Sequence, residues 1–260
     1  MSNFDNDNHK KSKLNICCKT IGKIRHLHPI FWLLVIITAL AFFVIFVPKT
    51  FWHHIWVTLK SHYILLSMIL VFCLLAISLV WTAGQSIDSA VFSFFNKYGK
   101  RPLWLDKTML IITEIGNGIV TVIIAVVLFF AVNEHLAYDF ILGTLTLWLV
   151  VELIKSLVHR PRPYSNLKDV RVVGTRARGK SFPSGHTSQA FYMATLLVQY
   201  FNGNIIIAIG LYIVAALVGM TRMYMGMHYP RDVLAGAILG TFWGFIGVVI
   251  NSAIFNLIGI

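Results

Sequence analysis

Long apolar runs alternate with short polar and basic stretches along this 260-residue chain. A membrane-crossing helix needs about 20 predominantly apolar residues, and these runs reach or approach that length. Seven runs qualify, two of them near the short limit: 31–47, 63–83, 109–132 with a break at 116–118, 140–158, 186–201, 205–220 and 233–258. The pattern predicts an all-α, polytopic membrane helix bundle with six or seven transmembrane segments.

Two details of the pattern refine this prediction. Residues 86–107 alternate apolar and charged positions, which is typical of an amphipathic helix lying at the membrane interface. The Gly116-Asn117-Gly118 break in the third run predicts a kink or a close helix contact, and a plain loop boundary fits it equally well.

The composition supports a membrane protein. The chain is 57% hydrophobic and only 12% charged, and its mean hydropathy of +0.75 is too high for a soluble globular domain. The net charge of +12 is divided between the N-terminal tail and the loops, and no basic helix face is interleaved with stacking aromatics. We therefore expect no nucleic-acid partner; membrane topology and an anionic substrate explain the charge better.

The N-terminus differs from the rest of the chain. Residues 1–29 are polar and basic and predict a disordered cytoplasmic or interfacial tail, followed by one membrane domain at 30–260. A cleaved signal peptide is the competing interpretation, although the basic region is long for one. Cys17, Cys18 and Cys73 show no metal-ligand spacing, and we expect no structural disulfide; palmitate on the first two is an alternative to free thiols.

The fourth run ends in a cluster of cations. Lys155 lies seven positions before Arg162, and Pro161 and Pro163 end the helix, which places Arg162 just past its terminus. A cation inside an apolar run is costly unless it meets an anion or water, so Lys155 is a functional candidate. The alternative is that Lys155 snorkels and that Arg160 and Arg162 only anchor the helix end at the headgroups.

The fifth run begins with Ser184, Gly185 and His186. Ser184 occupies the position of an N-cap, so the free amides of Gly185 and His186 open a helix and form a natural anion cradle. Glycine lets a bound group approach the backbone closely, and His186 then stands where it can give a proton to a leaving alkoxide. Without the other motifs, a helix cap with an interfacial histidine would be the default interpretation.

A third stretch joins the sixth and seventh runs. Arg222 ends the sixth run, His228 lies in a short loop, and Asp232 falls in the first turn of the seventh, which Pro230 opens. The spacing of four lets the Asp232 carboxylate accept a hydrogen bond from one ring nitrogen of His228, which leaves the other nitrogen free to attack phosphorus. Taken alone, Asp232 could equally cap its helix and His228 could be interfacial.

The coincidence of the three stretches favours a function. Alternating spans place these ends of runs four to seven on one side of the membrane, where three cations, two histidines and a carboxylate meet. Phosphoryl transfer on a membrane-embedded substrate needs such groups. Three cations can offset the charge that a divalent ion would neutralise, so we expect no metal and no cofactor. Glu152 can pair with Lys155, and neither Glu152 nor Glu114 receives a catalytic role.

The motifs K-x6-R-P, P-S-G-H and R-x5-H-x3-D resemble those of the type 2 phosphatidic acid phosphatase (PAP2) superfamily, also called the lipid phosphate phosphatases. The third motif of that family usually begins Ser-Arg, whereas this chain has Thr221 before Arg222, which keeps the hydroxyl. The resemblance covers a motif-bearing core of about residues 88–247. It implies a PAP2-like helical fold and leaves the tail and the first run undescribed.

The resemblance also implies roles for individual residues. His228 would be the nucleophile that forms a phosphohistidine, Asp232 its orienting partner, and His186 the acid that protonates the leaving group and later activates water. The phosphoryl oxygens would be held by Lys155, Arg162, Arg222, Ser184 and the amide of Gly185. The family works without a metal, in agreement with the expectation above.

These observations lead to one main hypothesis and several rivals. The main one is hydrolysis of a lipid phosphate monoester or diphosphate, such as undecaprenyl diphosphate, phosphatidylglycerophosphate or phosphatidic acid, with the bilayer and this lipid as partners. Transfer of the phosphoryl group to a lipid or sugar alcohol is the alternative. A haloperoxidase, which shares this kind of pocket, and a non-catalytic transporter or scaffold are weaker rivals. The oligomeric state stays open.

The side of the membrane depends on the first run. If all seven runs span, the positive-inside bias puts the catalytic loops in the cytoplasm with the tail. The resemblance implies the opposite, because relatives generally act on the outer or lumenal face. If residues 31–47 do not cross, six spans leave the tail inside and the site outside. We therefore predict a multi-pass protein of a bacterial plasma membrane with an outward-facing site.

Overall fold

The computed structural model describes residues 38, 63–96, 101–177 and 179–258. Within these ranges every regular element is a helix, which confirms the all-α class. The helices are α4 (Tyr63–Ser78), α5 (Thr82–Asn96), α6 (Leu103–Glu114), α7 (Gly118–Ala131), α8 (Glu134–Val158), α9 (Pro163–Asn166), α10 (Gly185–Tyr200), α11 (Ile205–Tyr224) and α12 (Pro230–Ile258). They belong to one compact unit, Ile55–Ile260. The predictions for the tail, for the run at 31–47 and for Cys17 and Cys18 lie outside the described residues.

Several of these helices have the length and hydropathy that crossing a membrane requires. Among the described residues, Glu134–Asn166 and Ile205–Tyr224 each meet both criteria alone. The pairs α4–α5 and α6–α7 meet them as bent spans, with bends of 97° and 57°. The described part of the chain thus has two to four candidate spans, and the predicted total of six or seven stays a prediction.

The run at 63–83 is not one helix, which corrects the sequence-based boundary. Helix α4 ends at Ser78 and α5 begins at Thr82. Side chains donate hydrogen bonds to the backbone carbonyls at this break. Arg231 Nη1 donates to the Ser78 carbonyl at 2.5 Å, and Gln85 Nε2 donates to the Leu79 carbonyl at 2.9 Å. Carbonyls satisfied in this way do not need a continuing helix.

The predicted amphipathic stretch is also divided, because α5 ends at Asn96 and α6 begins at Leu103. The buried residues of α5, Asp88, Phe92 and Asn96, recur every four positions on one helix face, but two of the three are polar, so the amphipathic interfacial helix stays a prediction. The charged member of that face, Asp88, is only 2% exposed. A buried carboxylate on this face requires partners from the rest of the bundle.

The break at 116–118 is both a kink and a close contact. Asn117 caps α7 by accepting from the Ile119 amide at 3.1 Å. A Cβ on Gly116 would lie 2.9 Å from Val218 Cγ1 and would collide with the His186 carbonyl. Glycine is required here because α10 and α11 approach the backbone closely.

Helix α8 begins six residues before the predicted run. Asn133 caps it by accepting from the Leu136 amide at 3.0 Å, so the helix starts at Glu134. It ends at Val158, with His159 in the left-handed conformation (φ 51°). Pro161 lies two residues after His159. Proline disfavours the helical conformation of the residue before it, so a helix end close to this position was expected.

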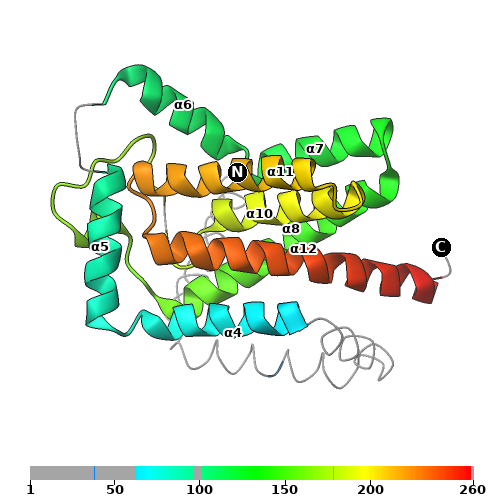
Figure 1. The fold of residues 1–260 in the computed structure, drawn as a ribbon, viewed down its shortest axis with the longest axis horizontal. Coiled ribbons are helices and arrows are strands. Elements are labelled where there is room, and N and C mark those ends of the chain that lie inside the picture. Colours follow the sequence, from blue (N-terminus) through cyan, green and yellow to red (C-terminus); the bar gives the residue numbers. More distant parts are fainter. Residues whose placement is uncertain (1–37, 39–62, 97–100, 178, 259–260) are drawn as a thin grey trace, which may run out of the picture. The chain divides into compact units, whose positions relative to one another are not determined.

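Helix α10 lies centrally in the bundle and packs against α12, α11, α8 and α7 (Figure 1). Small residues on α12 permit a close approach: a Cβ on Gly236 would lie 2.7 Å from the Ser184 carbonyl, and one on Gly240 would lie 2.9 Å from the Ser188 carbonyl carbon. The start of α12 is therefore held against the start of α10.

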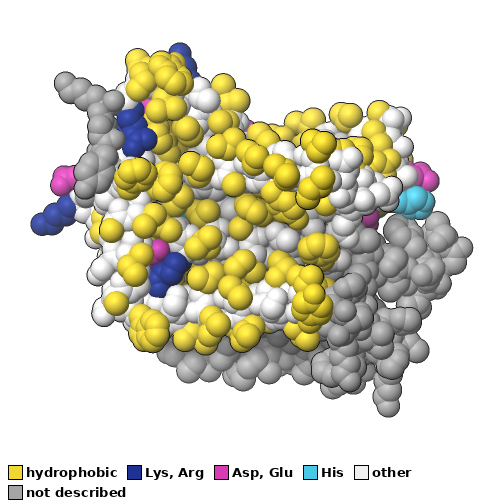
Figure 2. All heavy atoms as spheres, viewed as in Figure 1, with side chains coloured by type: hydrophobic (Ala, Val, Ile, Leu, Met, Phe, Trp, Pro, Cys, Tyr) yellow, Lys and Arg dark blue, Asp and Glu magenta, His cyan; other side chains and the backbone are white. Residues whose placement is uncertain are grey.

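The surface fits an apolar surrounding. Hydrophobic side chains cover the face shown in Figure 2 over α4, α11 and α12, whereas Lys and Arg on that face lie at the end that carries α5. Ile206 is 79% exposed and Leu70 60% exposed. Exposed aliphatic side chains on this scale are expected of a protein that faces lipid.

Candidate active site

Four helix ends meet at one end of the bundle: the end of α8, the start of α10, the end of α11 and the start of α12 (Figure 1). Hydrogen bonds join the three motif-bearing stretches there. Arg162 Nη1 lies 3.1 Å from His228 Nε2, and the Ser184 amide donates to the Asp232 carbonyl at 3.0 Å. The structure therefore assembles residues that are as much as 77 positions apart, from Lys155 to Asp232.

His228 is held by a hydrogen bond on each ring nitrogen. Its Nδ1 lies 2.8 Å from the Ser181 carbonyl, which can only accept. Its Nε2 faces Arg162 Nη1, which can only donate. The two partners together assign the proton to Nδ1 and leave a lone pair on Nε2. Burial and the nearby Arg162 and Arg222 cations lower the pKa of His228 to about 4, so the ring is neutral near pH 7.

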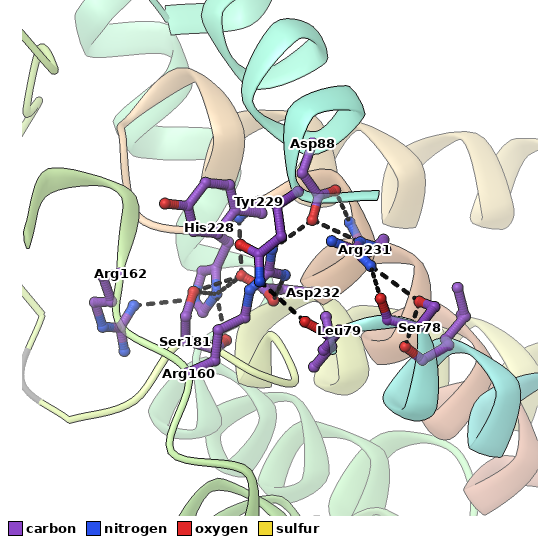
Figure 3. Close-up of polar contacts among 12 residues, drawn as sticks. Ser78, Leu79, Asp88, Arg160, Arg162, Ser181, His228, Tyr229, Arg231 and Asp232 are labelled. Atoms are coloured by element: carbon purple, nitrogen blue, oxygen red, sulfur yellow. Dashed lines mark hydrogen bonds and ion pairs between the residues drawn. The ribbon is translucent and has the colours of Figure 1, made fainter. Parts of the chain in front are cut away.

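Asp232 does not make the hydrogen bond to His228 that the spacing suggested. Its Oδ2 lies 3.7 Å from His228 Nδ1, beyond hydrogen-bond distance. The carboxylate instead accepts from the Tyr229 amide at 2.8 Å, from Ser181 Oγ and from Arg160 Nη1 at 2.5 Å (Figure 3). Asp232 thus holds two groups next to the histidine ring, Ser181 and the Tyr229 amide. It acts on the ring itself only through its negative charge.

The arginines of the motifs are buried. Arg162 is 4% exposed and donates to the carbonyls of Gly179 and Met227, both at 3.1 Å. Arg222 is 5% exposed and donates to Thr113 Oγ1 at 2.8 Å. Arg222 Nε is buried and has no hydrogen-bond partner among the described residues. This burial makes the headgroup-anchor interpretation of Arg162 wrong.

The start of α10 is open to an anion. Ser184 is the N-cap residue by position, but its Oγ accepts from Thr187 Oγ1 at 2.9 Å and does not cap the helix amides. A Cβ on Gly185 would lie 3.9 Å from Lys155 Nζ, so this ammonium group stands close to the first amides of the helix. Lys155 also pairs with Glu152 at 2.8 Å, as the sequence suggested.

A pocket of about 550 Å³ extends from this site between α7, α8 and α10, and is called here the α7–α8–α10 pocket. Its lining includes Lys155, Gly185 and His186 from the motifs. The apolar lining is Ile119, Val122, Leu145, Leu147, Trp148 and Val151. Lys155 and Leu145 are ten residues apart on α8, so the pocket runs about 15 Å along the helix. Such a pocket suits a ligand with one anionic and one apolar end.

Comparison with known proteins assigns this arrangement to a family. The PAP2 superfamily matches residues 136–255. Undecaprenyl-diphosphatase BcrC of Bacillus subtilis is 32% identical over 146 residues, 55% of this chain and 72% of that protein. The chain belongs to the PAP2 superfamily. It has a PAP2-like fold. It is a membrane phosphatase, that is, a phosphoric ester or diphosphate hydrolase of the PAP2 type.

Two further relatives agree. The undecaprenyl-diphosphatase of Sulfolobus acidocaldarius is 27% identical over 160 residues, 61% of this chain and 68% of that protein. The crystal structure of a transmembrane PAP2 type phosphatidylglycerolphosphate phosphatase from Bacillus subtilis aligns with a TM-score of 0.62 and 27% identity. That alignment covers 73% of this chain and 96% of the solved one. The PAP2 protein described here is accordingly an integral membrane protein.

Sequence reasoning missed two residues of this PAP2 site. Arg160, interpreted as a possible headgroup anchor, is 6% exposed and bridges Asp232 and Asp88. Asp88 comes from α5 and also pairs with Arg231 at 2.7 Å. The sequence did carry a weak signal, because Asp88 shares an α-helical face with Phe92 and Asn96. Its partner lies 72 residues away, and no local pattern reveals such a distant pair.

No group of three or more His, Cys, Asp or Glu side chains among the described residues is arranged to hold a metal ion. The carboxylates nearest to the histidines accept hydrogen bonds from arginine, serine and backbone donors. The absence of a metal from the reaction stays a prediction.

Proposed function

We propose that this PAP2 protein hydrolyses a lipid phosphate monoester or diphosphate through a phosphohistidine on His228. The observation that carries the proposal is the tautomer of His228. Its Nε2 lone pair lies beside Arg162, and its Nδ1 proton is donated to a carbonyl. A neutral imidazole with an unprotonated Nε2 in a cation-lined site is equipped for attack on phosphorus.

In the first step, His228 Nε2 attacks phosphorus and the bond from phosphorus to the lipid oxygen breaks. His186 enters this step protonated, a state that the anionic phosphate bound beside it favours, and gives that proton to the departing oxygen. His186 lines the α7–α8–α10 pocket beside Lys155. The Asp232 carboxylate, 3.7 Å from Nδ1, stabilises the positive charge that the phosphorylated ring acquires.

In the second step, the oxygen of a water molecule attacks phosphorus and the bond from phosphorus to Nε2 breaks. His186, neutral after the first step, accepts a proton from that water. Inorganic phosphate leaves and both histidines return to their starting states. When the substrate is a diphosphate, the first leaving group is the lipid monophosphate.

Cations and helix amides hold the phosphoryl oxygens in this proposal. Lys155, Arg162 and Arg222 supply positive charge, and the Gly185 amide and Ser184 supply donors at the start of α10. The unpartnered Nε of Arg222 supports this role, because a buried N–H group without an acceptor costs about 1–3 kcal/mol that a bound anion can offset.

The α7–α8–α10 pocket supports a lipid as the carrier of the phosphate. Its apolar side chains along α7 and α8 suit an acyl or prenyl chain that enters from the bilayer, with the headgroup at Lys155. The named substrates of the relatives are undecaprenyl diphosphate and phosphatidylglycerolphosphate. We propose substrates of these classes or phosphatidic acid, at the outward face of a bacterial plasma membrane.

The test is phosphate release by detergent-purified protein from a panel of lipid mono- and diphosphates, with EDTA present. We expect metal-independent release that His228→Ala reduces to background. Asp232→Asn should keep measurable turnover roughly 10²- to 10⁴-fold below wild type, because the nucleophile survives. Absence of release by folded wild-type protein contradicts the proposal. A phosphorylated alcohol in place of inorganic phosphate would establish phosphotransfer instead.

A further inference from the structure

Arg160 occupies a position between two buried carboxylates at the end of the bundle. Its Nη1 donates to Asp232 Oδ1 at 2.5 Å, and its Nη2 donates to Asp88 Oδ2 (Figure 3). The guanidinium carbon also lies 4.2 Å from the centre of the Tyr229 ring. Arg160 is 6% exposed, Asp88 2% and Asp232 0%, so these charges interact with little screening by water.

The Arg160 contact fixes how Asp232 is oriented. With Oδ1 bound to Arg160, the other oxygen, Oδ2, accepts from Ser181 Oγ and from the Tyr229 amide. Ser181 is the residue whose carbonyl accepts the Nδ1 proton of His228. Tyr229 follows His228 in the chain. One carboxylate therefore orders both the acceptor of the ring proton and the backbone beside the ring.

The same contact balances charge near the histidine. The charged and titratable groups around His228 are Arg162, Arg222, His186 and Asp232. Only Asp232 among them is negative, and Arg160 offsets that charge directly. Without Arg160, the carboxylate would attract the Nδ1 proton more strongly from its distance of 3.7 Å and would favour a protonated ring.

We infer that Arg160 is a positioning residue of the PAP2 reaction, held by Asp88, that fixes Asp232 and thereby keeps His228 in the tautomer with an unprotonated Nε2. This inference rests on the proposed function, because it concerns the same nucleophile. Arg160 touches neither histidine ring in any described hydrogen bond and acts through Asp232.

Arg231 provides a matched control. It forms an equally direct ion pair with Asp88, at 2.7 Å, and its side chain also donates to Ser78 at the α4–α5 break. It makes no described hydrogen bond to the Asp232 side chain. Loss of Arg231 therefore removes a buried ion pair of the same network while Arg160 and Asp232 keep each other.

The experiment compares Arg160→Gln, Arg160→Lys and Arg231→Gln with wild type in detergent, with folding checked by gel filtration and thermal unfolding. For Arg160→Gln we expect kcat to fall about 10- to 100-fold, the usual effect of removing an orienting partner. KM and inhibition by inorganic phosphate should change less than about 3-fold, because the phosphate ligands remain. Arg160→Lys should restore part of kcat, and Arg231→Gln should stay within about 3-fold of wild type.

A second measurement does not depend on turnover. The ¹⁵N chemical shifts of His228 in protein labelled with ¹⁵N-histidine, assigned by loss of the signals in His228→Asn, report the tautomer and its titration. We expect the Nδ1–H form in wild type and Arg231→Gln, and a mixed or protonated ring in Arg160→Gln at the same pH. If Arg160→Gln does not fold, Asp88→Asn, which weakens the hold on Arg160, should show an intermediate shift.

Two outcomes overturn the inference: an unchanged His228 tautomer in Arg160→Gln, or equal losses of kcat in Arg160→Gln and Arg231→Gln. A wild-type protein that releases no phosphate from any lipid would refute the proposed function instead. The tautomer measurement would then still decide whether Arg160 orders the histidine.

Discussion

At the scale of single residues, the site depends on a histidine that is kept neutral. His228 is 2% exposed and lies beside two arginines, and a protonated ring there would be a third buried cation. Its pKa of about 4 lies below the ordinary value of 6.5. Between pH 6.5 and about 4 the unfolded chain binds a proton at His228 and the folded protein does not. The contribution of His228 therefore lowers the free energy of unfolding as pH falls through that window.

This pKa predicts the acid limb of activity. Protonation of Nε2 removes the lone pair, so kcat/KM should fall as pH drops through about 4, after correction for the ionisation of the substrate phosphate. A profile of kcat/KM from pH 3.5 to 8 on a lipid phosphate checks this. An acid limb centred at 6.5 would mean that burial and the arginines do not act on His228 as described.

Residue patterns alone predicted many of the residues that the fold brings together in the candidate site. Lys155, His186 and Arg222 could be found because each interrupts an apolar run near its end. A polar or charged side chain in such a run is costly unless it has a partner or a function. The Ser181 carbonyl could not be found, because backbone groups leave no mark in a sequence. From the sequence, Arg160 resembled a surface anchor. Its ion pair with Asp88 joins elements that are far apart in the chain, and no periodic pattern in the sequence reveals such a pair.

At the scale of elements, the close approach of α12 to α10 matters most. Gly236 faces the Ser184 carbonyl at the start of α10, next to the amide that binds the Asp232 carbonyl. The apolar periodicity predicted both helices. It did not predict the 97° bend after Ser78, where Arg231 from a distant segment donates to the Ser78 carbonyl.

This contact gives a prediction with an internal control. Gly236→Ala places a Cβ 2.7 Å from the Ser184 carbonyl and should cost about 1–3 kcal/mol while displacing the start of α12 and lowering activity. Gly210→Ala on α11 meets nothing within 4 Å and should be neutral or stabilise by up to about 1 kcal/mol. Thermal unfolding in detergent measures both. Equal melting temperatures for the two variants would contradict the packing described.

At the scale of the whole molecule, the residues of the candidate site gather at one end of the helix bundle. The segment at 169–177 is part of that end, because the Arg171 amide donates to Asn96 and the Val173 amide donates to the Met225 carbonyl. The side of the membrane on which this segment lies is therefore the side of the site.

An introduced cysteine tests the predicted orientation. In a background without the native cysteines, Thr175→Cys places a thiol on an exposed position of this segment. For an outward site, a membrane-impermeant maleimide should label it in intact cells to the same extent as after permeabilisation. Labelling that requires permeabilisation would place the site in the cytoplasm and would favour seven spans over six.

The Ser181 carbonyl, which accepts from the His228 ring, has a consequence for mutagenesis. Every amino acid brings a carbonyl, so no replacement at Ser181 deletes this acceptor, and an alanine scan would register only the loss of the hydroxyl. The acceptor of the Nδ1 proton therefore survives every substitution at Ser181, whereas the contacts of Asp232 with Arg160 and with the Ser181 hydroxyl depend on the side chains themselves.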